Sequence, residues 1–474
     1  MTSDPTLLTI AEASALFESK ALSPVELAKA CIAKTEAIDG TLSSYITFTP
    51  EAALDAAKRA EAAIMSGKRL SPLQGIPIGL KDIYDTAGVA TTGHSRLMQS
   101  RVPADDATTV TKLKEAGAAI TGKLGTWEFA IGGPSFDLFH PIARNPWNPE
   151  HQTGGSSSGS AAAVAAGLVL GAMGTDTGGS IRSPSALCGI SGIKPTYGLV
   201  SRKGVLPLSQ SLDHAGPMAW TARDCAMMLQ VLAGHDPADP ASAREAIPDY
   251  TAMLGQPVKG LKIGVVRHFY EKDHVATESV RGAVEDAVAV FRDLGCSIHD
   301  VVLPPLIEFA AVNLTIMSAE AYSIHQQHLI KTPELYGEIC RDRVMLGSLV
   351  SGADYLNAQR RRRELCEEVA RAMADVDVLL TAASPFPAQK LGEVPKWLMY
   401  EKPSITAPFN VTGLPAMATC AGFDAAGLPL SIQIIGKPFT EAVVLALADA
   451  HETATAWRSR RPAIATDWQS KAAA

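Results

Sequence analysis

The sequence predicts one large α/β unit with added helices. Short apolar runs, which are typical of buried strands, alternate with segments of helical pattern along the chain. Hydrophobic residues make up 47% of the 474 residues and charged residues 19%, enough apolar material for an extensive core. The length alone leaves two domains open. No internal repeat occurs, and no linker is long enough to separate two independent domains, so a single unit is the better interpretation.

The first part of the chain has a helical pattern. Thr9 with Glu12, and Ser23 with Glu26, both fit the capping box, in which a hydroxyl and a carboxylate satisfy each other's free backbone N–H groups. Residues 51–65 have an alanine-rich helical pattern, and Gly67 follows as a typical helix-ending residue, so a helix is expected there. These features predict a helical N-terminal segment that packs on the rest of the molecule.

The remainder of the chain mixes expected strands and helices. We expect residues 1–70 to form the helical segment and residues 71–474 to form the α/β core, with a helical insert around residues 309–374. A further helix is expected over residues 107–116. The expected strands are residues 75–82, 118–122, 168–174, 261–266, 377–381 and 430–435.

Composition narrows the class of protein. A net charge of −7 argues against a large nucleic-acid-binding surface, and the basic run Arg360–Arg363 is flanked by glutamates, as on a solvated helix face. The seven scattered cysteines indicate a reducing compartment. The N-terminus lacks the pattern of a signal peptide, and the longest apolar run, residues 161–173, is too short to span a bilayer. We therefore expect a cytoplasmic protein with no membrane and no nucleic acid as partner.

Two clusters of glycine and serine stand close together, TGGSSSGS at residues 153–160 and TDTGGSIRSP at residues 175–184. A flexible linker is one interpretation, although the first cluster lies between an aromatic-rich segment and an alanine run that suits a helix. A phosphate-binding loop is another, but the nearest match, Gly117 to Lys123, is followed by leucine where a hydroxyl would be needed. The third interpretation is a hydrolytic site.

The second cluster contains the parts of an oxyanion hole. Successive N–H groups of Thr177, Gly178, Gly179 and Ser180 can converge on one point, because the glycines permit the necessary torsions. A developing oxyanion would be stabilised there, with Ser180 beside it as the candidate nucleophile. A short helix that begins with Ser183 as N-cap and the following proline would add positive potential.

The general base is less obvious. The sequence has no G-x-S-x-G motif, and His325 and His328 have neither H-E-x-x-H spacing nor clustered carboxylates, so they are interpreted as packing or surface residues rather than metal ligands. Lys81 ends the apolar run GIPIGL. A buried lysine can be neutral at pH 7 and accept a proton, although most single lysines are solvated.

Taken together these segments resemble the amidase signature family. The resemblance rests on GIPIGLKDIYDTAG, TGGSSSGSAAAVAAG, GTDTGGSIRSPSALCGISGIKPTYGLVSRKG, LPLSQSLDHAGPMAWTARDCA and PFNVTGLPAMATCAGF, which agree with the family in order and spacing over nearly the whole chain. The resemblance implies a single large mixed β-sheet covered by helices on both faces. It implies no cofactor and no metal, and homodimers are frequent in the family.

The resemblance also assigns a Ser-cisSer-Lys triad. By motif position the nucleophile is Ser180, the bridging serine is Ser156, preceded by a cis peptide bond, and the lysine is Lys81. An acyl-enzyme on Ser180 would then be hydrolysed by water. Asp176 and Arg182 are expected to orient the loop through hydrogen bonds. Ser157 and Ser158 are expected to be structural.

The substrate is less well defined than the chemistry. Members of the family cleave fatty, aryl and small carboxamides, and some accept esters or carbamates. We expect the acyl pocket to include Trp127, Ile131, Gly132 and Gly133, whose apolar character favours a hydrophobic or aryl small-molecule substrate. Arg343, in the helical insert, is interpreted either as a partner for a substrate carboxylate or as half of a structural ion pair.

The main alternative is the amidase subunit of a glutamyl-tRNA(Gln) amidotransferase, which works with partner chains. TYGLVSRKG and AGHDPADPAS are compatible with that subgroup, but SGADYLNAQRRRRELC departs from its tyrosine-rich helix. A free-standing amidase is therefore the favoured interpretation, and a catalytically dead binding protein is disfavoured because all three triad positions are intact.

Overall fold

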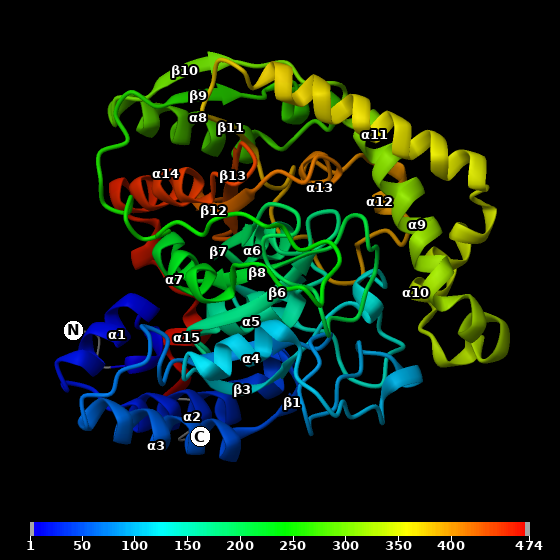
Figure 1. Cartoon of the computed structure of the whole chain (residues 1–474). Coiled ribbons are helices and arrows are strands. Elements are labelled where there is room, and N and C mark those ends of the chain that lie inside the picture. The colour runs from blue at the N-terminus through cyan, green and yellow to red at the C-terminus, as the bar shows by residue number, and fades with distance from the viewer. Residues whose placement is uncertain (1–3, 470–474) are drawn as a thin grey trace.

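The computed structural model describes residues 4–469 and centres on one large β-sheet (Figure 1). Its 11 strands are ordered β1-β3-β2-β6-β8-β7-β12-β13-β11-β9-β10, and a separate hairpin joins β4 to β5. The strands are β1 Tyr45–Phe48, β2 Pro77–Lys81, β3 Ala119–Leu124, β4 Arg144–Asn145, β5 Asn148–Gln152, β6 Gly171–Asp176, β7 Ser191–Lys194, β8 His214–Ala219, β9 Lys262–Val265, β10 Ser297–Asp300, β11 Val378–Ala382, β12 Ala416–Phe423 and β13 Pro429–Gly436. Strands β3, β2 and β6 run parallel, as do β11, β9 and β10, and the remaining pairs are antiparallel. The prediction of a single mixed sheet is confirmed.

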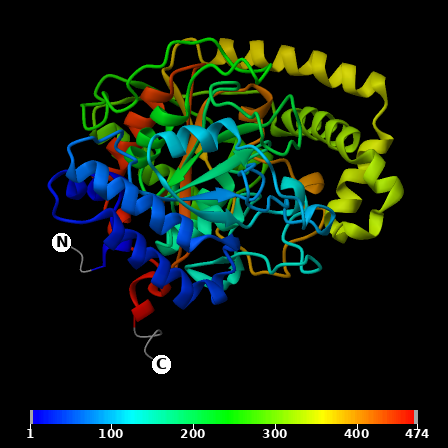
Figure 2. The ribbon, with the colours of Figure 1, turned by 60° about the horizontal axis from the view of Figure 1, so that its bottom comes forward.

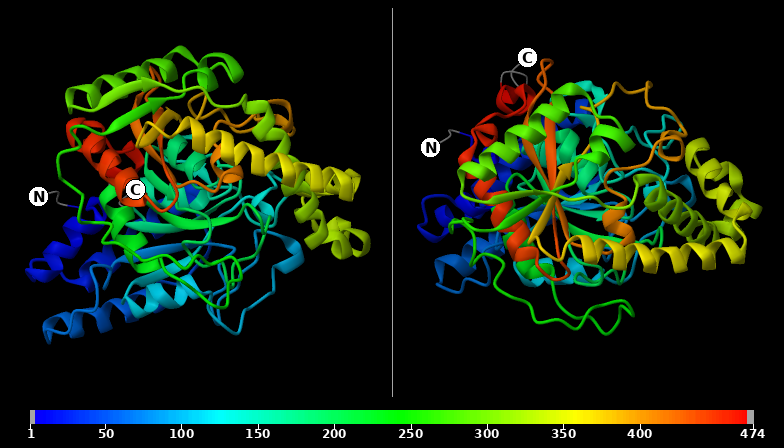
Figure 3. Two further views of the ribbon diagram at one scale, coloured as in Figure 1. Left: turned by 45° about the horizontal axis from the view of Figure 1, so that its top comes forward. Right: turned by 90° about the horizontal axis from the view of Figure 1, so that it is seen from above.

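Helices cover both faces of this sheet (Figure 3). Successive side chains of a strand point to opposite faces. In β6, accordingly, Ala172 and Met173 belong to two different hydrophobic clusters, and in β8 Met218 and Ala219 are divided in the same way. The sheet is therefore the middle layer of the molecule, with apolar packing on each side.

The helices of the N-terminal segment begin where the capping boxes predict. The hydroxyl of Thr9 accepts the N–H of Glu12 at 3.1 Å, and the Glu12 carboxylate accepts the N–H of Thr9 at 2.8 Å. Ser23 and Glu26 form the second box. The segment also contributes β1, which pairs with β3, so it is not wholly helical. The helices are α1 Ile10–Glu18, α2 Pro24–Leu42, α3 Pro50–Met65, α4 Thr108–Glu115, α5 Ser158–Ala166, α6 Arg182–Cys188, α7 Ala222–Leu232, α8 Glu278–Asp293, α9 Leu306–Lys331, α10 Glu338–Met345, α11 Gly352–Ala372, α12 Leu398–Glu401, α13 Pro408–Val411, α14 Glu441–Ala454 and α15 Ala463–Thr466.

The predicted helical insert consists of α9, α10 and α11, which extend to one side of the sheet (Figure 1). The basic run lies in α11. There Arg361 forms ion pairs with Glu364 at 2.9 Å and Glu368 at 2.7 Å of the same helix, and with Glu308 of α9. The guanidinium of Arg361 is therefore paired with carboxylates, as expected of a solvated helix face.

The two ends of the described chain meet on one side of the molecule (Figure 2). The indole N–H of Trp468 donates to Asp4 at 2.8 Å, and the same carboxylate is paired with the buried ammonium of Lys34 at 3.5 Å. Between residues 4 and 469, no helix combines the length and the apolar character that crossing a membrane requires.

Candidate active site

Two charged residues of the site lie at the carboxyl ends of neighbouring strands: Lys81 ends β2 and Asp176 ends β6. These strands are parallel neighbours, with Ile78 opposite Gly171 and Leu80 opposite Met173. Parallel strands end at the same edge of a sheet. Lys81, the last residue of β2, is therefore brought to the loop that follows β6, and it is fully buried.

The ammonium group of Lys81 has two hydroxyl partners. Its Nζ lies 2.7 Å from Ser156 Oγ and 2.8 Å from Thr175 Oγ1. Burial lowers the pKa of Lys81 to about 7, and the negative charges of Asp176 and Asp213 limit that decrease. At neutral pH a large fraction of Lys81 is therefore uncharged and has a lone pair that can accept a proton.

Ser156 lies directly before α5. The Gly155–Ser156 peptide bond is cis, as the resemblance implies. Glycine is needed at position 155, because a Cβ there would lie 2.3 Å from a ring carbon of Trp127. The hydroxyls of Ser157 and Ser158 each lie 3.3 Å from a backbone carbonyl oxygen, which agrees with their expected structural role.

Ser180 stands on the loop after β6 and is half-buried. Its carbonyl oxygen accepts the N–H of Ser157 at 3.2 Å, which ties the loop to the segment that holds Ser156. The structure thus brings Lys81, Ser156 and Ser180 together. Lys81 and Ser156 are directly hydrogen-bonded, whereas the Ser180 hydroxyl has no hydrogen bond to any part of residues 4–469.

The proposed oxyanion loop differs from expectation at one position. The N–H of Gly179 donates to the carboxylate of Asp176 at 2.8 Å, so it is already occupied. The N–H groups of Thr177, Gly178 and Ser180 make no hydrogen bond within the described chain. The set of candidate donors is therefore reduced from four to these three.

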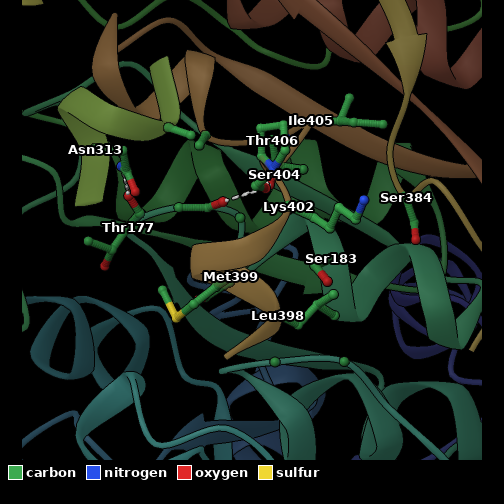
Figure 4. Close-up of a pocket in the computed structure, with 18 of the residues that line it drawn as sticks. Thr177, Ser183, Asn313, Ser384, Leu398, Met399, Lys402, Ser404, Ile405 and Thr406 are labelled. Atoms are coloured by element: carbon green, nitrogen blue, oxygen red, sulfur yellow. Dashed lines mark hydrogen bonds between the residues drawn. The ribbon is translucent and has the colours of Figure 1, made fainter. Parts of the chain in front are cut away.

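Two side chains from distant segments hold the carbonyl groups of this loop (Figure 4). Asn313 of α9 donates its Nδ2 to the carbonyl oxygen of Thr177 at 3.1 Å, and Thr406 donates its hydroxyl to that of Gly178 at 2.6 Å. In a trans peptide the N–H points opposite to the C=O. Holding the Thr177 carbonyl therefore turns the N–H of Gly178 to the other side. Neither side chain was expected from the sequence, nor was Thr175.

A buried ion pair holds the loop that carries Ser180 in place. Arg182 and Asp176 are both fully buried, with Arg182 Nη2 3.0 Å from Asp176 Oδ1. Asn410 donates to the same carboxylate at 2.8 Å. Burial alone would raise the pKa of Asp176, but the charge of Arg182 and these hydrogen bonds hold it below its usual range. The expectation that Asp176 and Arg182 orient the loop through hydrogen bonds agrees with this geometry.

The helix after the loop begins earlier than predicted. Helix α6 starts at Arg182 with Ile181 as its N-cap, so the prediction of Ser183 as N-cap is wrong. The reason is that the N–H of Ser183 already donates to the carbonyl oxygen of Gly179 at 2.7 Å, within a continuous turn. The hydroxyl of Ser183 instead lines the cavity beside Ser180.

A cavity of about 220 Å³ has Ser180 on its wall and is lined mainly by apolar side chains. Of the four residues expected to line the acyl pocket, Trp127 and Ile131 lie on the wall of this cavity. Gly132 and Gly133 do not. They lie behind the wall in a tight turn, where Gly133 has φ +66° and a Cβ would meet Arg343 Nη1 at 3.1 Å.

Arg343 lines the cavity but does not form the structural ion pair that was one of its two expected roles. Its guanidinium is buried and donates to the carbonyl oxygens of Ile131 at 2.7 Å and Lys396 at 3.1 Å. No carboxylate of the described residues pairs with it. Arg343 therefore braces the pocket wall with its donors and contributes positive charge to the pocket.

Of the two histidines considered in the insert, His325 is a packing residue, and His328 is exposed on the surface. His325 is buried, lies 2.9 Å from the hydroxyl of Tyr336 and packs against Phe129. Burial lowers the pKa of His325 to about 4. Across residues 4–469 no three His, Cys, Asp or Glu side chains are placed to hold a metal ion together.

Comparison with known proteins agrees with this geometry. The family model named Amidase matches residues 26–445. The chain belongs to the amidase family. Among solved structures, a bacterial aryl acylamidase described as an amidase signature enzyme has a TM-score of 0.85 and 26% identity over 98% of each chain. The resemblance and the fold predicted from it are confirmed, and the protein is an amidase, an enzyme that cleaves C–N bonds.

Two further relatives of this amidase bear on its partners. One subunit of the glutamyl-tRNA(Gln) amidotransferase of Geobacter metallireducens is 42% identical over 96% of this chain and 99% of its own. A structure described as a vestigial protein complex that reveals the origins of an s-triazine catabolic enzyme has a TM-score of 0.88 and 31% identity, over 94% of this chain and 98% of its own. These relatives contradict the expectation that only a small-molecule substrate and a second copy are partners.

Proposed function

We propose that this amidase works as one subunit of an assembly, as the amidase component of a glutamyl-tRNA(Gln) amidotransferase. The observation that carries the proposal is the 42% identity to such a component over nearly the full length of both chains. The absence of a tyrosine-rich helix counts less than this, because it concerns one short stretch in α11.

The chemistry begins with activation of Ser180. Neutral Lys81 accepts the proton of the Ser156 hydroxyl, and Ser156 takes the proton of Ser180. The Ser180 oxygen attacks the amide carbonyl carbon and forms a tetrahedral intermediate. The 2.7 Å contact between Lys81 and Ser156 supports the first transfer, and a pKa of about 7 keeps Lys81 available as a base.

The oxyanion is stabilised by the N–H groups of Thr177, Gly178 and Ser180, which have no other acceptor in the described chain. Collapse of the intermediate breaks the C–N bond, and the leaving amine takes the proton from Lys81 through Ser156. Water then attacks the acyl-enzyme, gives its proton to the same relay and releases the acid, while Ser180 recovers its proton.

Reconstitution tests the assembly. We expect the chain to co-purify with the other subunits of an amidotransferase from the same source and to support amidation of glutamyl-tRNA(Gln), measured as conversion to glutaminyl-tRNA(Gln). A Ser180→Ala assembly should bind equally well but transfer no amide nitrogen. Failure to co-purify with those subunits would refute the proposed assembly.

The second candidate is a hydrolase that releases the free acid from small amides without tRNA. The mainly apolar cavity favours it, together with the similarity to an aryl acylamidase. The two candidates differ in one measurement. The isolated chain should hydrolyse alkyl or aryl amides at full rate in the second case, whereas in the first its activity should rise when the partner subunits are added.

A further inference from the structure

Thr177, whose N–H group is one of the three donors left in the oxyanion loop, is held at two other points. Asn313 of α9 donates its Nδ2 to the carbonyl oxygen of Thr177 at 3.1 Å, and Figure 4 shows the Asn313 side chain directed toward Thr177. The hydroxyl of Thr177 donates to Asp213 Oδ1 at 2.5 Å. Because both its carbonyl and its side chain are fixed, the backbone of Thr177 has little freedom to turn. The direction of its N–H therefore depends on Asp213 as well as on Asn313.

Asp213 is itself held firmly in place. Its second carboxylate oxygen, Oδ2, accepts the N–H groups of Leu208 at 2.9 Å and Ser209 at 3.0 Å. The next residue, His214, begins β8 and lies opposite Asp176, the last residue of β6. The carboxylate therefore lies at the edge of the sheet where the oxyanion loop begins.

Helix α9 anchors the loop that carries Asp213. The hydroxyl of Ser209 donates to Glu320 Oε2 at 2.5 Å, and the N–H of Ser211 donates to the same oxygen at 3.0 Å. Glu320 belongs to α9, the helix that also contributes Asn313. One helix of the insert thus supports the oxyanion loop in two ways, directly through Asn313 and indirectly through Asp213.

Asp213 also lies close to the base. Asp213 and Thr175, a hydroxyl partner of Lys81, line the same second cavity, of about 460 Å³. Burial raises the pKa of Asp213, and its three hydrogen bonds together with the charge of Arg202 limit that increase. The negative charge of Asp213 favours the ammonium form of Lys81 and so opposes the lowering of the Lys81 pKa by burial. The other titratable groups around these two residues have partners of their own: Asp176 with Arg182, Asp82 with Lys123, Arg202 with Asp239, the Tyr84 hydroxyl with the carbonyl oxygen of Gly174, and His214 Nδ1 with that of Leu212.

We propose that Asp213 is a positioning residue of this amidase, whose carboxylate holds the hydroxyl of Thr177, and with it the oxyanion loop, in the orientation that catalysis requires. Asp213 lies outside the cavity beside Ser180, so it acts through Thr177 rather than on the substrate. Its charge also sets the pH at which Lys81 accepts a proton. The inference rests on the proposed attack by Ser180 and adds a residue that supports it.

The first test removes the hydroxyl of Thr177. Thr177→Val keeps the shape of the side chain and the backbone N–H, but it loses the hydrogen bond to Asp213. We expect kcat for pentanamide to fall about 10- to 100-fold, with KM within about twofold of wild type. Thr177→Ser restores the hydroxyl and should recover most of the loss. An unchanged kcat in Thr177→Val, or an equal loss in Thr177→Ser, would overturn the proposal.

Two variants of Asp213 separate its hydrogen bond from its charge. Asp213→Ala removes both, and at about pH 9, where Lys81 is neutral in either protein, kcat should fall about 10- to 100-fold. In a Thr177→Val background the same change should cost less than about threefold more, because the two residues act through one contact. Asp213→Asn removes the charge, so the rise of kcat/KM with pH should move to lower pH by roughly one unit, since the ammonium form of Lys81 loses a stabilising charge. Additive losses, or an unmoved pH profile, would overturn the proposal.

A variant of Glu320 tests the anchor in α9. Glu320→Ala releases the loop that carries Asp213 and should lower kcat about 3- to 30-fold. Glu334→Ala is the matched control, because it removes the same charge from an exposed position just after α9, and it should leave kcat unchanged. Equal kcat values in the two variants would show that α9 does not hold Asp213 in its working position.

Labelling of Ser180 by a fluorophosphonate separates this inference from the proposed function. The reagent places a negatively charged oxygen in the oxyanion loop as Ser180 attacks, and it needs neither an amide nor partner subunits. Labelling should be about 10- to 100-fold slower in Thr177→Val and much less affected in Thr177→Ser. This result supports the inference even if wild type hydrolyses no amide, which would refute only the proposed function. Equal labelling rates in wild type and Thr177→Val would overturn the inference whatever the hydrolytic activity.

Discussion

Replacement of Lys81 tests the central proton transfer. Burial lowers the pKa of Lys81 from 10.5 to about 7, which corresponds to a cost of about 5 kcal/mol for keeping the ammonium form in the folded protein. At pH 7 an ordinary lysine is neutral in about one molecule in 3,000, whereas Lys81 is neutral in about half. Burial in the fold thus raises the neutral fraction of Lys81 at pH 7 by about three orders of magnitude.

The rate of hydrolysis should increase with pH. Because only the neutral amine accepts a proton, kcat/KM should rise tenfold per pH unit below about pH 7 and level off above it. The assay is hydrolysis of pentanamide between about pH 5.5 and 9, because this substrate does not titrate in that range. Lys81→Arg, which stays charged, should lose about 10²- to 10⁴-fold in rate at every pH.

Two results would refute this reasoning. A rate independent of pH between about 6 and 8 would mean that Lys81 does not titrate as the base. Retention of the rate in Lys81→Arg would mean that the proton of Ser156 goes elsewhere. Lys29→Gln should reproduce the wild-type profile and thereby exclude a general effect of removing a lysine.

Three further substitutions test other parts of the site, and a fourth tests the buried carboxyl group of Glu128, which follows Trp127 in the chain. Ser180→Ala should abolish both hydrolysis and labelling by a fluorophosphonate, and retained hydrolysis would identify a different nucleophile. Asn313→Leu removes the hydrogen bond to the oxyanion loop and should lower kcat about 10- to 100-fold with little change in KM, so an effect on KM alone would contradict the positioning role. Arg182→Met leaves the charge of Asp176 buried and unpaired and should lower the free energy of unfolding by about 3–5 kcal/mol in a denaturant titration. Burial raises the pKa of Glu128 to about 7, so stability should fall by roughly 3 kcal/mol as pH rises from about 4.5 to 7, and Glu128→Gln should flatten this dependence.

The strands around the site differ in how well the sequence predicts them. β2 and β6 were expected, because each is part of an apolar run, and their parallel pairing places Lys81 beside the Gly-Ser loop. β8, with the sequence HAGPMA, was not expected. Glycine and proline lower its intrinsic strand preference, and its pairing with β6 and β7 supplies what local sequence does not.

The residues of the site also differ in how well the sequence predicts them. Lys81, Ser156 and Ser180 were identifiable because they stand in short motifs with recognisable flanks. Asn313 and Thr406 were not, because they lie 136 and 228 residues from the loop carbonyls that they hold. A hydrogen bond over such a separation leaves no pattern in one sequence. The occupied N–H of Gly179 was missed for a related reason, since it depends on the side-chain orientation of Asp176.

The hydrogen bond from Thr406 to Gly178 has a consequence for synthesis of the chain. All three relay residues leave the ribosome before the segment that holds their loop, since Ser180 precedes Thr406 by more than two hundred residues. Throughout that interval the nascent chain has its nucleophile and its base but lacks the contact that orients the oxyanion loop. The chain therefore becomes able to hydrolyse amides only late in translation, when most of the residues that enclose the cavity have already been synthesised.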